Sequence, residues 1–383
     1  MTHIAGAKSV EVAGPVPLFE LATQWQLIRN EVEGAIKEVL ESQQYTSGAV
    51  SGPFVGRFEE HLGKQLGAYV VALSSGTDAI LAAMMALKIG AGAEVVTTPF
   101  SFFATAGCIA RAGAKPVFVD IDADTFLMDV QRVEGAITGQ TRAIVPVHLY
   151  GQMLDSGALA AIACKHGLDV IEDAAQAIGS RDAAGKQVAE NARCACLSFY
   201  PTKNLGAAGD AGALVTRDEK LAIRFRQTRQ HGETARYHHE FVGGNFRMDA
   251  IQAAVLDVKL RHLESWTKRR RTIAAYYTKR FVGTDVKPPR ELPGVYHVYH
   301  QYVIRVPERD AVRDYLTKEG VGCNVFYPKG LHLQECFADL GYAKGAFPVT
   351  ERACEEVLAL PVFPELTDRQ MERVADTILA FYK

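Results

Sequence analysis

Short apolar runs alternate with helical patterns through the first two thirds of this 383-residue chain. Seven runs, several nearly continuous in Val, Ile, Leu or Phe, are predicted strands: 69–73, 94–98, 115–120, 143–148, 169–172, 195–199 and 212–216. Such runs are typical of strands covered on both faces of a sheet. Helical patterns lie between them, at 79–88, 104–112, 130–137 and 154–166. This order predicts an α/β domain with a mostly parallel seven-stranded sheet, and a ligand at the carboxyl ends of its strands.

The remaining third predicts a smaller domain. A long helix is expected over 248–281, with one apolar stripe formed by Ile251, Val255, Val258, Leu263 and Trp266. A proline-rich break (KPPRELPG), a strand at 302–306 and a final helix at 368–382 follow. We therefore expect a large domain over 1–250, with two N-terminal helices and the loop Tyr45-Thr46-Ser47-Gly48, and a small C-terminal domain over 251–383.

Composition excludes several classes of partner. The formal net charge is −2, which argues against nucleic acid, and the basic run Lys268–Arg271 is expected to be a solvated helix face, with diphosphate binding as the alternative. No apolar run has the ~20 residues of a membrane span, and residues 1–19 do not have the pattern of a signal peptide. Seven cysteines without a C-x-x-C pair indicate reduced thiols and a cytoplasmic protein, with Cys194 and Cys196 on one face of a strand.

The segment Ser74-Ser75-Gly76-Thr77-Asp78 follows a predicted strand and begins a predicted helix. Gly76 lets the backbone turn and approach a ligand, and the free N–H groups at the helix start suit one phosphate. An ordinary N-cap formed by the serine or threonine is the alternative. The segment lacks the spacing of a P-loop or of a G-x-G-x-x-G motif.

Two more segments place reactive side chains after predicted strands. Glu172 and Asp173 close one strand, where a carboxylate can hold a proton on a ring nitrogen. The alternative there is an acidic helix N-terminus, with Gln176 on the surface. Ser198 and Lys203 follow the next strand, in SFYPTKNLG. A lysine among apolar and aromatic groups becomes a nucleophilic amine because its pKa falls, although an exposed surface charge is the alternative.

A phosphate cradle, a carboxylate and a lysine at neighbouring strand ends are the parts that a pyridoxal phosphate (PLP) enzyme requires. They would serve as the phosphate anchor, the partner of the pyridine nitrogen and the Schiff-base amine. Lys203 follows Asp173 by 30 residues, which leaves room for one crossover and a strand.

With these parts in order, the chain resembles the sugar aminotransferases of PLP fold type I, which act on nucleotide-linked keto-sugars. The resemblance covers nearly the whole chain and is strongest in SFYPTKNLG. It also includes the motifs SGTDA, PFSFFATA, VHLYGQ, EDAAQAIG, GGNFRMDAIQAAVL, HQYVIRV and YPKGLHLQ. One departure is Gly330, where many relatives have proline.

The resemblance implies roles for the residues that match these motifs. Lys203 forms the internal aldimine with PLP, Asp173 pairs with the pyridine nitrogen, and Gln176 lies near the phenolic oxygen. Phe102 stacks on the ring. The remaining residues contact the phosphate: Gly76, Thr77, Ser198 and, from the neighbouring subunit, Asn245.

That last role implies a homodimer with active sites at the subunit interface. The resemblance also places Tyr327 and His332 toward the substrate and makes Arg247 a candidate for a carboxylate, with a structural ion pair as the alternative. His148 is expected to be a hydrogen-bonded structural histidine rather than a cofactor contact.

No metal is expected, because neighbours such as His238 and His239 do not easily share one ion. The stretch 232–244 is expected to be a flexible loop near the substrate.

The expected reaction is therefore transfer of an amino group, from glutamate by resemblance, to a nucleotide-linked keto-sugar. The product would be an amino-sugar for glycan or lipopolysaccharide synthesis. The motif wording favours a 3-keto substrate over a 4-keto substrate. A PLP-dependent sugar dehydratase is a weaker alternative, since relatives of that kind carry His in place of the lysine. A non-catalytic regulator on the same fold would be favoured by loss of the lysine, the aspartate or the phosphate motif, none of which is lost.

Overall fold

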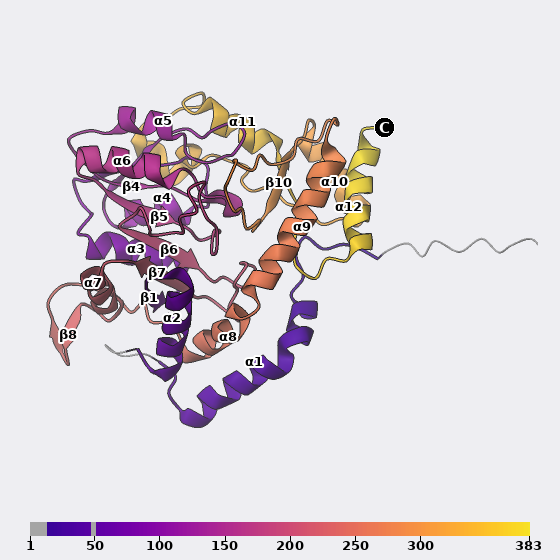
Figure 1. Cartoon of the computed structure of the whole chain (residues 1–383). Coiled ribbons are helices and arrows are strands. Elements are labelled where there is room, and N and C mark those ends of the chain that lie inside the picture. Colours follow the sequence, from indigo (N-terminus) through magenta and orange to yellow (C-terminus); the bar gives the residue numbers. More distant parts are fainter. Residues whose placement is uncertain (1–13, 47–50) are drawn as a thin grey trace, which may run out of the picture.

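A seven-stranded sheet forms the centre of the computed structural model, which describes residues 14–46 and 51–383 (Figure 1). The strand order is β1-β7-β6-β5-β4-β2-β3. The bounds are β1 (Tyr69–Leu73), β2 (Glu94–Thr97), β3 (Lys115–Phe118), β4 (Thr141–Val145), β5 (Asp169–Asp173), β6 (Cys194–Ser198) and β7 (Gly212–Thr216). Only β7 runs antiparallel to its neighbours β1 and β6. The predicted sheet is thus confirmed. The bounds of β4 differ most from the predicted ones, since the strand was expected at 143–148.

Helices cover both faces of this sheet. On one face lie α3 (Gly76–Ala86), α4 (Ala104–Arg111) and α7 (Glu219–Arg229), which share a core with Val71 and Leu214. On the other lie α2 (Pro53–Leu66), α8 (Ala250–Leu260) and, farther along the sheet, α5 (Val130–Val133) and α6 (Ser156–His166). Cys194 and Cys196 both lie in the first of these cores, as predicted, and all seven cysteines are free.

The prediction of one continuous helix over 248–281 is wrong. The chain forms α8 and then α9 (Leu263–Phe281), separated at Arg261 and His262. Both of these N–H groups bond to carbonyls three residues back, which tightens the end of α8. The break lets the two apolar stripes pack on different partners, because α8 packs on the central sheet and α9 on the C-terminal elements.

A second, two-stranded sheet pairs β10 (Tyr302–Arg305) antiparallel with β11 (Val357–Leu360). Around it lie α9, α10 (Arg309–Lys318), α11 (Pro348–Glu356) and α12 (Asp368–Phe381). The capping box of Thr367 and Gln370 begins α12. Helices α9, α10 and α12 share an apolar core with the two strands, whereas Ala353 and Cys354 of α11 pack in a core with residues of the large sheet. The expected domain boundary at 250/251 stays a prediction, and α8, which follows it, contributes side chains to the core of the large sheet.

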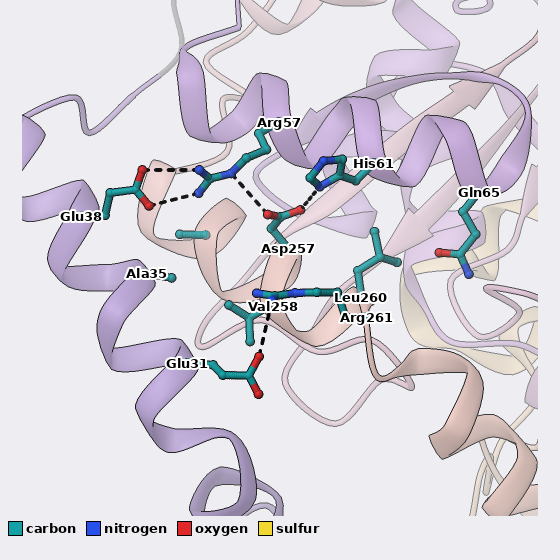
Figure 2. Close-up of a pocket in the computed structure, with 11 residues that line it drawn as sticks. Glu31, Ala35, Glu38, Arg57, His61, Gln65, Asp257, Val258, Leu260 and Arg261 are labelled. Atoms are coloured by element: carbon teal, nitrogen blue, oxygen red, sulfur yellow. Dashed lines mark hydrogen bonds and ion pairs between the residues drawn. The ribbon is translucent and has the colours of Figure 1, made fainter.

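Helix α1 (Ala22–Ser42) packs on α8 through Ile28 and Val32, so the N-terminal segment does not stand apart. An open cavity of about 690 Å³ lies between α1, α2 and α8 (Figure 2). Its charged side chains pair across it: Arg57 contacts both Glu38 and Asp257, and His61 contacts Asp257 at 2.6 Å. These pairs fix α1 and α2 on α8. Of the predicted loop after α1, Ser47 and Gly48 lie outside the described residues.

The stretch 232–244 contains a small hairpin, β8 (Glu233–Ala235) with β9 (His238–His239), where a loop was expected. Along the described ranges, no helix combines the length and the apolar character that crossing a membrane requires.

The interpretation of Lys268–Arg271 as a solvated face is wrong. Lys268 is exposed, but Arg270 is buried, and its Nη1 donates to the carbonyls of Tyr299, His300 and Val362. Arg269 bonds to the Leu366 carbonyl. These carbonyls come from segments distant in sequence, so no local pattern could reveal them. The run therefore connects α9 to the C-terminal segments.

Substituting Arg270→Met should lower the free energy of unfolding by about 2–4 kcal/mol, because several buried carbonyls lose their donor. Denaturant titration would measure it. The control Lys268→Met, on the same helix, should change stability by less than about 0.5 kcal/mol. Equal effects of the two variants would contradict the role given to Arg270.

Candidate active site

The three segments singled out by their sequence meet at one edge of the sheet. Ser74 follows β1, Asp173 ends β5, and Ser198 ends β6. Strands β5 and β6 are parallel neighbours, so their carboxyl ends lie together, with Asp173 opposite Cys196. Ser198 pairs with Gly212 of β7, and β7 pairs in turn with β1. The fold thus assembles the site from strands that are far apart in sequence.

The segment Ser74–Asp78 caps helix α3 and also leaves backbone N–H groups without a partner in the helix. Ser75 Oγ accepts from Asp78 N at 3.0 Å, so the capping interpretation is correct. The N–H groups of Gly76 and Thr77, at the first two positions of α3, still have no acceptor within the helix. A Cβ on Gly76 would lie 2.6 Å from Ser198 Cβ. Only glycine therefore permits this close approach of the helix start to Ser198.

Asp173 is buried, and its carboxylate accepts hydrogen bonds from two donors. Its Oδ2 accepts from Thr105 Oγ1 at 2.7 Å, and its Oδ1 accepts from Ala175 N at 3.2 Å. Thr105 contacts Ser101 in turn, with 2.9 Å between the hydroxyl oxygens. The carboxylate is therefore held in one orientation at the strand end. The analysis of the sequence missed Thr105, although it lies in PFSFFATA three residues after Phe102.

Gln176 is buried rather than a surface residue. Its Oε1 accepts from Tyr150 N at 2.6 Å, and its Nε2 donates to the hydroxyl of Tyr327 at 3.2 Å. Tyr327 lies with its ring centroid 6.4 Å from that of Phe102. Phe102 itself is 58% exposed, which leaves its face open for stacking. The structure thus brings these three predicted residues together.

Lys203 is half-buried and follows the end of β6 in a tight turn, in which its N–H donates to the Tyr200 carbonyl. Burial lowers the pKa of Lys203 to about 8, against the opposing charge of Asp173. Burial disfavours the ammonium form, so more of the amine is uncharged near neutral pH. The alternative of an exposed surface charge is therefore wrong.

The segment around Asn245 runs beside the segment Ser74–Asp78. Ser74 N donates to Phe246 O at 2.9 Å, and Arg247 forms a bridge with Leu73. Asn245 is exposed. Arg247 Nη1 donates to Gln230 Oε1 at 2.9 Å, and in the described ranges it forms no ion pair. A substrate role for Arg247 stays a prediction, and so does the alternative of a structural ion pair.

Two predicted histidines are fully buried. His332 has its Nε2 3.1 Å from Glu351 Oε1 and packs against Phe347, and its substrate role stays a prediction. His148 lies 3.4 Å from Glu172 through Nε2, without a side-chain hydrogen bond in the described part of the chain. Its backbone N–H donates to Asp173 O, which supports a structural role but not the predicted hydrogen-bonded ring.

Comparison with known proteins decides the family. Residues 26–379 match the DegT/DnrJ/EryC1/StrS aminotransferase family. The chain belongs to this family. It is an aminotransferase of PLP fold type I, and the cofactor of the family is PLP.

Several relatives match over nearly their whole length. A pleiotropic regulatory protein of Geobacillus stearothermophilus is 48% identical over 96% of this chain and 99% of its own. A UDP-N-acetyl-3-dehydro-alpha-D-glucosamine 3-aminotransferase of Acidithiobacillus ferrooxidans is 40% identical over 95% of this chain and 97% of its own. The crystal structure of S. venezuelae DesV in complex with a ketimine intermediate superposes with a TM-score of 0.93, at 37% identity over 97% and 99% of the chains. Further relatives are also named for 3-oxo or 3-amino sugars.

The residues present fit PLP. The narrow cradle at Gly76, Thr77 and Ser198 suits a phosphate, which the helix start would bind through N–H groups. Asp173 offers a fixed carboxylate, and Lys203 an amine of lowered pKa. When bound, the cofactor supplies an electron sink for negative charge on a substrate carbon.

In the enzyme freed of cofactor, capture of PLP by Lys203 should accelerate as pH rises through about 8, because only the uncharged amine attacks. The rate would be followed by absorbance. Asp173→Asn should move this midpoint to lower pH, because the charge of Asp173 raises the pKa of Lys203. A midpoint near 10.5, the ordinary lysine value, would contradict the account.

Gly76→Ala should weaken PLP binding about tenfold or more, since the new methyl group meets Ser198 where the phosphate is expected. Equilibrium titration of the cofactor-free protein would measure the change. Gly34→Ala on exposed α1, where a Cβ meets nothing within 4 Å, is the matched control and should bind PLP normally.

Proposed function

We propose that this aminotransferase moves an amino group from L-glutamate to the 3-keto group of a nucleotide-linked sugar. The observation that carries the catalytic assignment is the joint presence of Lys203, Asp173 and the Gly76 cradle at one sheet edge. The 3-keto assignment is supported by the relatives named for 3-oxo and 3-amino sugars. A 4-keto sugar is the alternative substrate.

Four side chains have distinct roles in the proposed reaction. Lys203 Nζ takes the proton from the α-carbon of the donor, which its lowered pKa permits near neutral pH. Asp173, fixed by Thr105 and Ala175, would hold a proton on the ring nitrogen of the cofactor. Gln176 and Phe102 would orient the ring from its edge and its face.

A regulatory role is suggested by the names of two relatives, the 48% identical pleiotropic regulatory protein and a 40% identical erythromycin biosynthesis sensory transduction protein. Retention of the lysine, the aspartate and the cradle favours an enzyme over a non-catalytic regulator. The presence of Lys203 also argues against the sugar dehydratases, whose members carry histidine there.

The proposal extends to assembly and location. Asn245 is exposed beside the phosphate cradle, which supports a homodimer in which it reaches the partner's phosphate. The seven free cysteines support a cytoplasmic enzyme. Its product would enter glycan or lipopolysaccharide synthesis.

The test begins with the visible absorbance band of the purified enzyme. We expect glutamate to bleach it and a nucleotide-linked 3-keto sugar to restore it, whereas the matched 4-keto sugar should not. Lys203→Ala should lack the band from the start. Restoration by the 4-keto sugar alone would overturn the regiochemistry, and a Lys203→Ala protein with full absorbance and activity would overturn the lysine assignment.

A further inference from the structure

Asn204, the residue directly after Lys203, is buried and has both ends of its side chain bound. Its Nδ2 lies 2.9 Å from the carbonyl oxygen of Val298, and its Oδ1 lies 3.3 Å from Nδ1 of His300. The Val298 carbonyl can only accept a hydrogen bond, so the NH₂ group of Asn204 must face it. The amide oxygen therefore faces His300.

This orientation fixes the tautomer of His300. An amide oxygen accepts but does not donate, so Nδ1 of His300 must carry the hydrogen. Burial, together with the charges of Lys203 and Arg270, lowers the pKa of His300 well below its ordinary value, which keeps the ring neutral. Nε2 is then an unprotonated acceptor. The residue borders a small cavity of about 70 Å³, which Thr202, Gln301 and Arg270 also line.

The segment that carries His300 is itself fixed from two sides. Arg270 of α9 donates to the carbonyls of Tyr299 and His300, at 3.3 and 3.4 Å. On the other side, Val298 N donates to Gly151 O at 2.9 Å. A Cβ on Gly151 would lie 2.8 Å from Val298 Cγ2, so only glycine permits this close contact. The His300 ring is therefore held against the turn that carries Lys203.

We propose that His300, acting through Asn204, is a positioning residue that sets the orientation of Lys203 for reaction with its carbonyl partner. His300 links the turn that carries Lys203, after β6, to the segment before β10 and to α9. The inference rests on Lys203 being the lysine that binds the cofactor.

The test measures PLP capture by the cofactor-free enzyme across pH. His300→Phe and Asn204→Ala should each slow capture about tenfold, because a misplaced nucleophile reacts more slowly. His300→Phe should also move the pH midpoint downward, since a phenyl ring stabilises the ammonium less than imidazole does. The double variant should be no slower than either single variant, because both remove one contact.

Two controls separate positioning from general damage. His300→Gln keeps an N–H donor toward Asn204 and should restore most of the rate. His297→Asn alters a buried histidine of the same segment, which stacks on Tyr299, and should leave rate and midpoint unchanged. If His300→Phe does not fold, Asn204→Ala and its comparison with His297→Asn carry the test.

The inference would be overturned if His300→Phe captured PLP at the normal rate and with the normal pH midpoint. If His300→Phe does not fold, normal capture by Asn204→Ala would overturn it. Full additivity of the two substitutions, or an equal loss in His297→Asn, would also overturn it. Failure of the lysine assignment is distinguishable, because Lys203→Ala would then keep its visible band. If that band is lost but His300→Phe behaves as wild type, only the role of His300 is wrong.

Discussion

The fixed position of Asp173 is the constraint on which the site depends. Its backbone joins β5 to the end of β4, since its N–H donates to Pro146 O and its carbonyl accepts from His148 N. Its side chain accepts from Thr105 of α4 and from Ala175 N. Because the end of β4, helix α4 and the turn after β5 all contact Asp173, its position is set by several elements at once. Lys203 lies in the turn after the adjacent strand β6, and the charge of Asp173 partly opposes the effect of burial on the pKa of Lys203.

A second set of contacts connects this edge to the C-terminal elements. Arg270 leaves α9 to bind carbonyls of the segment before β10 and of the segment after β11. From there, His300 contacts Asn204, next to Lys203. Gln176 contacts Tyr327, which also lies in the C-terminal part of the chain. The turn that carries Lys203 and the side chain of Gln176 are therefore both contacted by residues that follow the central sheet in the sequence.

The sequence predicted what local patterns determine. Continuous apolar runs identified all seven strands of the sheet, and the residues after them identified the edge where Asp173 and Lys203 lie. Contacts between residues far apart in the sequence could not be predicted in this way. No glycine or proline marks the break at Arg261 and His262. The local pattern around Arg270 is that of a solvated residue, and only its contacts with distant carbonyls show that it is buried. Thr105 has an ordinary helical context, so only its contact with Asp173 reveals it. The strand β11 was missed because it follows α11 without a turn signal.

The central claim is that Lys203 is the lysine that binds the cofactor, and mapping of the reduced linkage tests it most directly. The holoenzyme would be treated with borohydride, digested and sequenced by mass spectrometry. The account predicts a phosphopyridoxyl group on Lys203 and on no other lysine. Lys259 is a demanding comparison, because burial also lowers its pKa and its Nζ lies 2.8 Å from Gly206 O, in the loop after Lys203. A label on Lys259, or on any lysine other than Lys203, would contradict the account.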